Sequence, residues 1–286
     1  MGLCEGCKRI LVTGAGGFAG GIVARHLSRQ GWDVTGTVHR QDAQGDFPTV
    51  RLDLSQPWDV PGRYDAIIHA AGSLPYRKPS ILEYKRSNID AMQYLVEYAK
   101  CTEVKRVIYF STIGVYGDFC GNTAVDEETD IINPDAYGLT KYVAECLLRE
   151  SGIENISLRM PGLIGPGARP VWFTDTVEKF RRGENVRIYA PDFQTRNFVW
   201  VEDVAGFIAH LLEQSEWAYD RFVLACHESA SIRDIAREMQ KLSGSSSQIL
   251  VEESARHPFC LNPERALSFG YRPLKPLEIV RIYMSE

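Results

Sequence analysis

The stretch that decides the fold is Lys8–Gly20, which reads KRILVTGAGGFAG. It opens as a short apolar run rich in β-branched residues, typical of a buried strand, and ends as a glycine-rich turn. Phe18–Gln30 then has the apolar spacing of a helix, and Asp33–His39 is again typical of a strand. Strand, glycine turn, helix and strand in this order predict a β-α-β unit of the kind that binds dinucleotides.

Strands and helices continue to alternate after this unit. Apolar runs at Ala66–His69, Arg106–Phe110 and Ile156–Arg159 are interleaved with helical patterns at Ile81–Lys100 and Ala136–Ser151. The alternation predicts a doubly wound α/β fold of the Rossmann type, with a parallel sheet covered on both faces. We therefore assign residues 1–160 to an NAD(P)-binding Rossmann domain.

Glycine and proline become frequent after residue 160, and the alternation becomes less regular. This change predicts a smaller α/β substrate-binding lobe over residues 161–286, interleaved in space with the first domain. Four short helices are expected after residue 160, at Val171–Arg182, Val204–Gln214, Ile232–Leu242 and Pro263–Ser268.

Composition limits the class of function. The chain has 286 residues, of which 44% are hydrophobic and 24% charged, so it can bury a full core. A net charge of −5 and dispersed Lys and Arg argue against a nucleic-acid partner. Without a signal peptide or an apolar run near the roughly 20 residues that span a bilayer, we expect a cytoplasmic protein with no membrane partner. The seven cysteines, including Cys4 and Cys7, are then expected to be free thiols, and no metal site is indicated.

The glycines of the turn have different tasks. Gly14 permits the tight turn, Gly17 lets the backbone approach a pyrophosphate at the helix N-terminus, and Gly20 allows the helix to pack closely on the sheet. Together with Phe18 and Ala19, Gly14 and Gly17 are candidate cofactor-binding residues.

The ends of the second and third strands bear on cofactor choice. NAD sites usually end the second strand with a carboxylate for the ribose 2′-hydroxyl, whereas NADP sites place a cation there. This chain has His39 and Arg40, which favours NADP(H) over NAD(H). Asp53 and Leu54 are expected at the end of the third strand, where the Asp53 carboxylate could accept a hydrogen bond from the adenine amino group.

Tyr137 and Lys141 are four residues apart in a predicted helix, so their side chains share one face. A phenol with a pKa near ~10 is a poor base at neutral pH, but an adjacent ammonium and an oxidised nicotinamide favour its ionised form. The pair gains specificity from the glycine turn and from Ser111 and Thr112, which end a predicted strand. Tyr137 is therefore the candidate acid/base.

These motifs resemble the extended branch of the short-chain dehydrogenase/reductase family, over nearly the whole chain and in the same order. The matching segments are Thr13–Gly20, Asp53-Leu54, His69–Gly72, Asn88, Phe110–Gly117 and Tyr137–Lys141. The resemblance implies that Thr112, with Ser111 as the alternative, hydrogen-bonds the reacting oxygen while Tyr137 exchanges its proton. Lys141 would also hold the nicotinamide ribose. Further cofactor contacts implied are Ala70, Ala71, Gly72, Asn88 and Pro161.

The second half resembles enzymes that act on nucleotide-linked sugars. Arg196 and Arg256 match residues that bind the substrate diphosphate, a task suited to the planar guanidinium group. With Ser73 and Thr112 they are the candidate substrate contacts. The chain departs from the usual pattern of these enzymes at two further positions, with Gly162 in place of Asn and Asn197 in place of Asp.

Sugar dehydratases carry an Asp-Glu pair directly after the catalytic Thr, where this chain has Ile113 and Gly114, so dehydration lacks its acid and base. We therefore predict 4-keto reduction or 4-epimerisation of a nucleotide-diphosphate sugar, by a homodimer formed through Ile81–Lys100 and Ala136–Ser151. The alternatives are an oxidoreductase of a non-sugar alcohol or ketone, and a dinucleotide-sensing protein without catalysis. The presence of both Tyr137 and Lys141 disfavours the sensor.

Overall fold

A computed structural model of the chain describes residues 9–118, 124–253 and 259–285, which form two compact units. The first unit holds the described residues up to Gly117, together with Asp130–Arg159 and Val204–Phe222. The second holds the remaining described residues, including Met160–Asp203 and those from Val223 onward. The helix expected at Val204–Gln214 is α6 (Val201–Glu213), and most of it belongs to the first unit.

A seven-stranded sheet forms the centre of the first unit, in the order β12-β7-β5-β4-β1-β2-β3. Its strands are β1 (Arg9–Thr13), β2 (Asp33–Val38), β3 (Thr49–Arg51), β4 (Ala66–His69), β5 (Arg106–Thr112), β7 (Glu154–Met160) and β12 (Arg221–Val223). The pairs from β3 through β2, β1 and β4 to β5 are all parallel. Because β1 lies between β2 and β4, the strand order reverses beside β1. Open α/β sheets bind ligands at the carboxyl ends of the strands at such a switch point.

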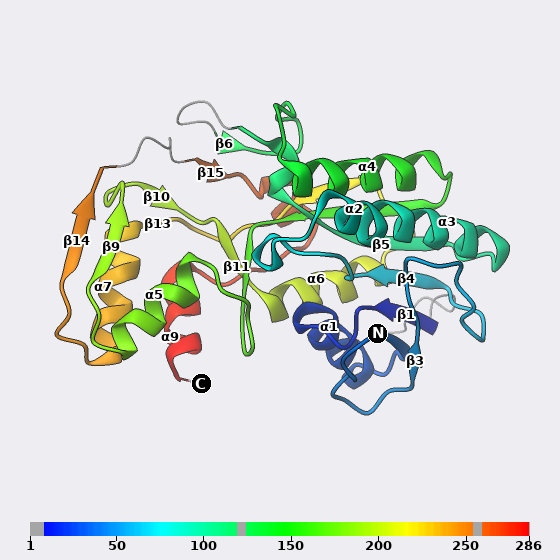
Figure 1. The fold of residues 1–286 in the computed structure, drawn as a ribbon, viewed down its shortest axis with the longest axis horizontal. Coiled ribbons are helices and arrows are strands. Elements are labelled where there is room, and N and C mark those ends of the chain that lie inside the picture. The colour runs from blue at the N-terminus through cyan, green and yellow to red at the C-terminus, as the bar shows by residue number, and fades with distance from the viewer. Residues whose placement is uncertain (1–8, 119–123, 254–258, 286) are drawn as a thin grey trace. The chain divides into compact units, whose positions relative to one another are not determined.

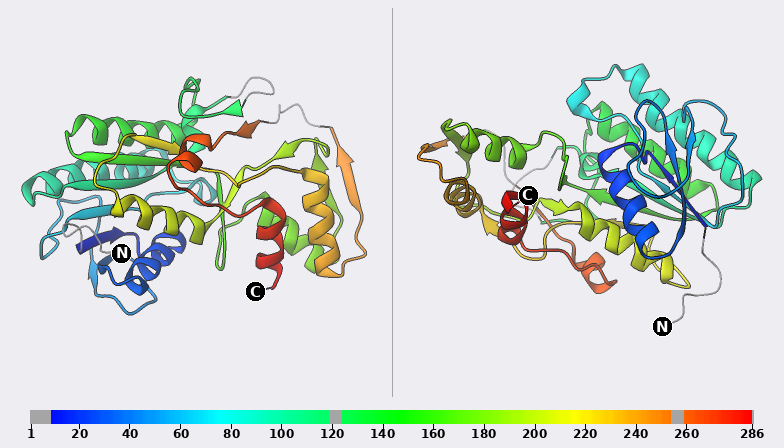
Figure 2. Two further views of the ribbon diagram at one scale, coloured as in Figure 1. Left: turned by 180° about the vertical axis from the view of Figure 1, so that it is seen from behind. Right: turned by 90° about the horizontal axis from the view of Figure 1, so that it is seen from below.

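Helices cover both faces of this sheet. Figures 1 and 2 show α3 (Ala91–Cys101) and α4 (Ala136–Glu150) on one face, and α1 (Phe18–Arg29) and α6 on the other. The core under α3 and α4 includes Met92, Leu95, Ala144 and Leu148 from the helices and Leu11, Ile67 and Val107 from the strands. Full burial of one such side chain stabilises the fold by about 1.5–3 kcal/mol relative to exposure.

The helix expected at Ile81–Lys100 is interrupted by a wider turn. It consists of α2 (Ile81–Tyr84), a π-helix, η2 (Lys85–Asp90), and α3. Ser80 caps α2 through a capping box with Glu83, which fixes where the helix begins. The π-helical turn is a feature frequently found at functional sites.

The second unit surrounds its own apolar core. Its helices are α5 (Trp172–Arg181), α7 (Ile232–Ser243), α8 (Glu264–Ser268) and α9 (Pro276–Ser285), of which α9 was not expected from the sequence. Pairs of short strands join β8 (Gly162–Ile164) to β11 (Phe198–Trp200), β9 (Val186–Tyr189) to β14 (Ile249–Glu252), β10 (Gln194–Thr195) to β13 (Ala230–Ser231), and β6 (Ala124–Val125) to β15 (Cys260–Leu261). Among the helices described, none is both long and apolar enough to cross a bilayer.

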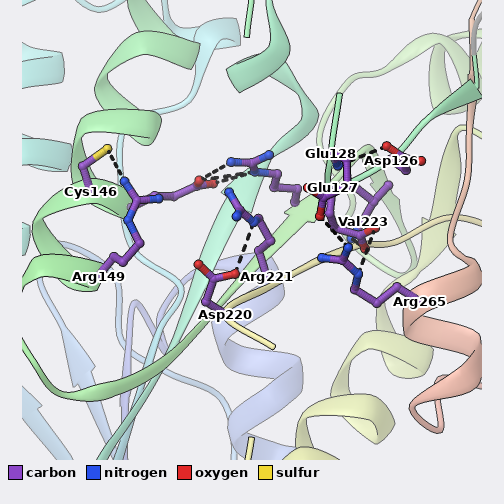
Figure 3. Close-up of polar contacts among 11 residues, drawn as sticks. Asp126, Glu127, Glu128, Cys146, Arg149, Asp220, Arg221, Val223 and Arg265 are labelled. Carbon is purple, nitrogen blue, oxygen red and sulfur yellow. Dashed lines mark hydrogen bonds and ion pairs between the residues drawn. The ribbon is translucent and has the colours of Figure 1, made fainter. Parts of the chain in front are cut away.

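Glu127 fixes an early segment of the chain within the second unit. Its carboxylate accepts a hydrogen bond from the Val223 amide at 2.6 Å and lies 3.6 Å from Arg265, contacts that Figure 3 shows. The carboxyl group is buried, and this burial raises its pKa. The described residues 124–129 belong to the second unit, although they precede residue 160.

Candidate active site

The glycine turn after β1 has the shape of a phosphate-binding turn. Gly14 has a φ of +73°, which favours glycine, and a Cβ added to it would lie 3.1 Å from the backbone of Ala71. Helix α1 begins after Gly17 with no side-chain cap and no acidic residue in its first turn, which contains Phe18 and Ala19. The amides of this turn therefore have no acceptor from a capping side chain, and they fit the pyrophosphate of a dinucleotide.

The segment after β4 lies against the glycine turn. Gly14 packs on Ala71, as its short distance to that backbone shows, so the ends of β1 and β4 meet at the switch point. His69 ends β4, and its Nδ1 is hydrogen-bonded to Thr13 Oγ1 at 2.8 Å. Burial lowers the pKa of His69 to about 3, so its imidazole is neutral. The predicted cofactor segment Ala70–Gly72 is thus adjacent to the predicted pyrophosphate site.

His39, Arg40 and Asp53 lie near one another after β2 and β3. The Asp53 carboxylate accepts hydrogen bonds from the Ser55 amide and hydroxyl at 3.0 and 2.8 Å, and these lower its pKa. The charges of His39 and Arg40 lower it further. Asp53 and Leu54 follow β3 and do not end it, because β3 stops at Arg51. The side chains of His39 and Arg40 are both exposed.

Thr112 and Tyr137 form a hydroxyl pair. Thr112 ends β5, and its Oγ1 accepts a hydrogen bond from the Gly114 amide at 3.1 Å. A Cβ added to Gly114 would lie 3.4 Å from Thr112 Oγ1 and 3.8 Å from Tyr137 Cδ1, so the two side chains are neighbours. Burial raises the pKa of Tyr137 to about 12, and the Thr112 side chain opposes that rise. Ser111, the alternative hydroxyl, instead donates to Glu145, so Thr112 is the one that contacts Tyr137.

Lys141 lies one turn after Tyr137 on α4 and is only 5% exposed. Burial lowers its pKa to about 7, against the opposing charge of Glu145. A Cβ added to Gly72 would lie 3.8 Å from Lys141 Nζ and 2.8 Å from Asn88 Oδ1, so these three residues form one cluster. The structure therefore brings the predicted proton donor, its lysine and the segment after β4 together within one unit.

Asn88 is held inside this cluster by the π-helix. Its Oδ1 accepts a hydrogen bond from the Ser73 amide at 3.1 Å, and its Nδ2 donates to Thr140 Oγ1 at 3.0 Å. The side chain is buried with both polar groups paired. Asn88 thereby ties the loop after β4 to α4, the helix that carries Tyr137 and Lys141.

Sequence reasoning missed a buried ion pair between α4 and β7. Arg159 Nη2 and Glu145 Oε2 are 2.7 Å apart, with side chains only 1% and 4% exposed. Arg159 Nε adds contacts of 3.2 Å to both carboxylate oxygens. The spacing could have drawn attention to Glu145, because this residue is four positions after Lys141 and shares its helical face.

Arg196, a predicted substrate residue, and its neighbour Asn197 are hydrogen-bonded to the backbone of Phe259 and Leu261. Arg196 Nε donates to the Leu261 carbonyl at 2.8 Å. Asn197 donates to the Phe259 carbonyl at 2.6 Å and accepts from the Leu261 amide at 2.9 Å. An Asp could not make both bonds, because a carboxylate has no proton to donate, which explains the Asn at 197. Pro161, a predicted cofactor contact, directly follows β7 and belongs to the second unit.

Some predicted residues are not covered. Arg256, Cys4 and Cys7 lie outside the described residues. Within the described ranges, no group of three or more His, Cys, Asp or Glu side chains is placed to hold a metal ion.

Residues 10–225 match the model of the NAD dependent epimerase/dehydratase family. The chain belongs to this family. A UDP-N-acetyl-alpha-D-glucosaminuronate decarboxylase of Bacillus cytotoxicus is 24% identical to it, over 85% of this chain and 83% of the relative. A dTDP-4-dehydro-6-deoxy-D-allose reductase of a Streptomyces species is 26% identical, over 86% and 85%.

Solved structures of the same type support the fold. UDP-glucuronic acid 4-epimerase from Bacillus cereus, solved in complex with NAD, matches this chain with a TM-score of 0.80 and 22% identity over 97% of each chain. The predicted Rossmann-type fold and the predicted family are both confirmed.

Proposed function

We propose that this chain reduces, or epimerises at C4, the sugar of a nucleotide-diphosphate sugar with a nicotinamide dinucleotide as the redox cofactor. The observation that carries the proposal is the hydroxyl pair of Thr112 and Tyr137, one helical turn from the buried ammonium of Lys141. The keto-sugar reductase among the relatives supports the substrate class. Ile113 and Gly114 leave dehydration without an acid and a base.

In the direction of reduction, Tyr137 Oη donates a proton to the carbonyl oxygen of the sugar. Thr112 Oγ1, which accepts from the Gly114 amide, keeps its own proton to donate to the same oxygen. The glycine turn after β1 would hold the dinucleotide, whose nicotinamide would supply the hydride for reduction or take it up in the reverse direction. Lys141 stabilises the phenolate that Tyr137 leaves behind, since a neighbouring ammonium favours the charged form.

Reduction is expected to slow as the pH rises through about 7, the pKa to which burial lowers Lys141. Above this pH Lys141 is neutral and no longer stabilises the phenolate, whereas Tyr137, with a pKa of about 12, stays protonated. The pH dependence of kcat/KM measures this. Lys141→Arg keeps its charge across neutral pH and should remove the decline, while an unchanged decline would assign it to another group.

We further propose that NADP(H) is preferred over NAD(H). Arg40→Ala is expected to weaken NADPH binding by about tenfold or more and NADH binding little, because it removes a charged partner of the 2′-phosphate. Fluorescence titration of the cofactor-stripped protein measures both affinities. Arg63→Ala is a matched control, since Arg63 is also exposed but pairs only loosely, at 3.7 Å, with Glu103. Equal losses for the two dinucleotides would contradict the assignment.

The substrate class is tested by the same titration in the presence of nucleoside diphosphates and nucleotide sugars. Tightening of NADPH binding by one nucleoside diphosphate would support a keto-sugar reductase and identify the nucleotide. A preference for NADH would favour the epimerase, because an epimerase regenerates its dinucleotide. Indifference to every nucleoside diphosphate would overturn the sugar substrate and favour a non-sugar ketone or alcohol.

We also propose that the protein acts as a homodimer through α2, α3 and α4. Large apolar side chains are exposed on these helices, Ile81 and Leu82 on α2 and Leu139 on α4. Exposed apolar side chains that cluster favour burial in an interface. Sedimentation velocity over a range of concentrations tests the proposal.

A further inference from the structure

The ammonium of Lys141 lies over an aromatic ring. Lys141 Nζ is 4.2 Å from the centroid of the Tyr109 ring, which is on β5 and fully buried. The Tyr109 ring stacks in turn on His69, with centroids 5.6 Å apart and planes inclined by 19°. His69 is fixed by its hydrogen bond to Thr13. A continuous stack therefore runs from the end of β1 through β4 and β5 to the lysine on α4.

We propose that Tyr109 is a positioning residue, whose ring face holds the Lys141 ammonium in place and favours its charged form. The proposal rests on the function proposed above for Lys141. The face of an aromatic ring is electronegative and attracts a cation, most strongly where water is excluded. The ring thus supplies part of the stabilisation that a carboxylate would otherwise provide.

The other groups around Lys141 provide little stabilisation for its ammonium. The charge of Glu145 on α4 raises the pKa of Lys141, but the Glu145 carboxylate is bonded to Arg159 and Ser111. No carboxylate forms an ion pair with Lys141 in the ranges that the structure describes. The remaining neighbours are neutral at neutral pH.

These neutral neighbours come from β4, β5, α4 and the π-helix. His69 on β4 has a pKa of about 3, and burial raises the pKa of Tyr109 on β5 well above its usual value. Tyr137 on α4 has a pKa of about 12, and Asn88 on the π-helix carries no charge. His69, Tyr137 and Asn88 therefore offer the ammonium no negative charge.

The contact uses the ring of Tyr109 and not its hydroxyl group. Tyr109 Oη is buried, and no described residue is its hydrogen-bond partner. A buried hydroxyl without a partner costs stability, so its removal should be tolerated. Tyr109→Phe is therefore a conservative variant that keeps the ring and separates the two parts of the side chain.

The test measures the pKa of Lys141 directly, by NMR titration of the full chain labelled with 15N at lysine Nζ. The signal of Lys141 is the one missing from a Lys141→Arg variant. Tyr109→Leu is expected to lower this pKa by about one unit, which corresponds to the loss of a buried cation–π contact. Tyr109→Phe is expected to restore the wild-type value. Tyr109→Met serves in place of Tyr109→Leu if the leucine variant does not fold.

Tyr98→Leu is the control for a general effect of removing a buried aromatic ring. Tyr98 belongs to the same core and contacts Trp58, with ring centroids 5.7 Å apart. An unchanged Lys141 pKa in Tyr109→Leu, or an equal shift in Tyr98→Leu or Tyr109→Phe, would overturn the proposal. Because the titration needs no substrate, a shift confined to the variants without the ring supports the contact even if no nucleotide sugar is turned over. That failure would count against the proposed function alone.

Discussion

Tyr137→Phe should lower kcat/KM for ketone reduction by about 10²- to 10⁴-fold, the range over which a positioned acid accelerates proton transfer. The variant loses the proton that is transferred to the carbonyl oxygen, and the hydrogen bond from Thr112 alone does not replace it. The phenyl ring keeps its packing against Tyr84, whose ring centroid lies 5.8 Å away, so the fold and the dinucleotide affinity should be retained. Oxidation of NADPH in the presence of nucleotide 4-keto sugars measures the effect.

Tyr142→Phe provides the matched control for this variant. It is the same substitution on the same helix, but the Tyr142 hydroxyl interacts with Arg149 and not with Thr112. Wild-type turnover in Tyr137→Phe would exclude the mechanism. An equal loss in Tyr142→Phe would instead show that the change acts through the helix.

The first unit could be predicted in detail because its signals are local. A glycine turn needs a backbone conformation that few other residues adopt, and Gly14 has the positive φ that the motif implies. The strand Ala66–His69 was predicted with its observed bounds, and the helix predicted at Ala136–Ser151 ends one residue earlier, at Glu150. The apolar pattern that predicts such an element lies within the segment itself, so it can be read without knowing the tertiary contacts.

The features that the sequence did not predict depend on contacts between distant residues. The π-helical turn at Lys85–Asp90 accompanies bonds from Asn88 to the loop after β4 and to α4. The hydrogen bond from Ser111 to Glu145 joins residues that are 34 apart along the chain. Neither partner can be identified from the periodicity of one segment.

The second unit shows the same limit at a larger scale. Its strands are two to four residues long and pair across long separations, as β6 does with β15. Such short segments carry too few residues to display a period, and α9 was missed for a related reason, since Pro276 and the apolar run after it also fit a loop.

Arg159→Met is expected to lower the free energy of unfolding by about 3–5 kcal/mol, the usual cost of breaking a buried ion pair by removing one partner. Arg159 and Glu145 are both almost fully buried, so the variant leaves the carboxylate of Glu145 without its paired guanidinium in a poorly solvated site. The hydrogen bond from Ser111 remains to it. Urea unfolding followed by far-UV circular dichroism measures the loss.

Two further variants separate the charge from the packing. The double variant Glu145→Gln with Arg159→Met removes both charges, so it should recover most of the stability that Arg159→Met loses. Arg63→Met makes the same substitution in an exposed pair with Glu103, where the side chains are 82% and 71% exposed, and should cost little. If the double variant were no more stable than Arg159→Met, the cost would lie in lost packing of the Arg159 side chain over the Tyr116 ring, 4.8 Å away, and the stranded charge of Glu145 would not be its source.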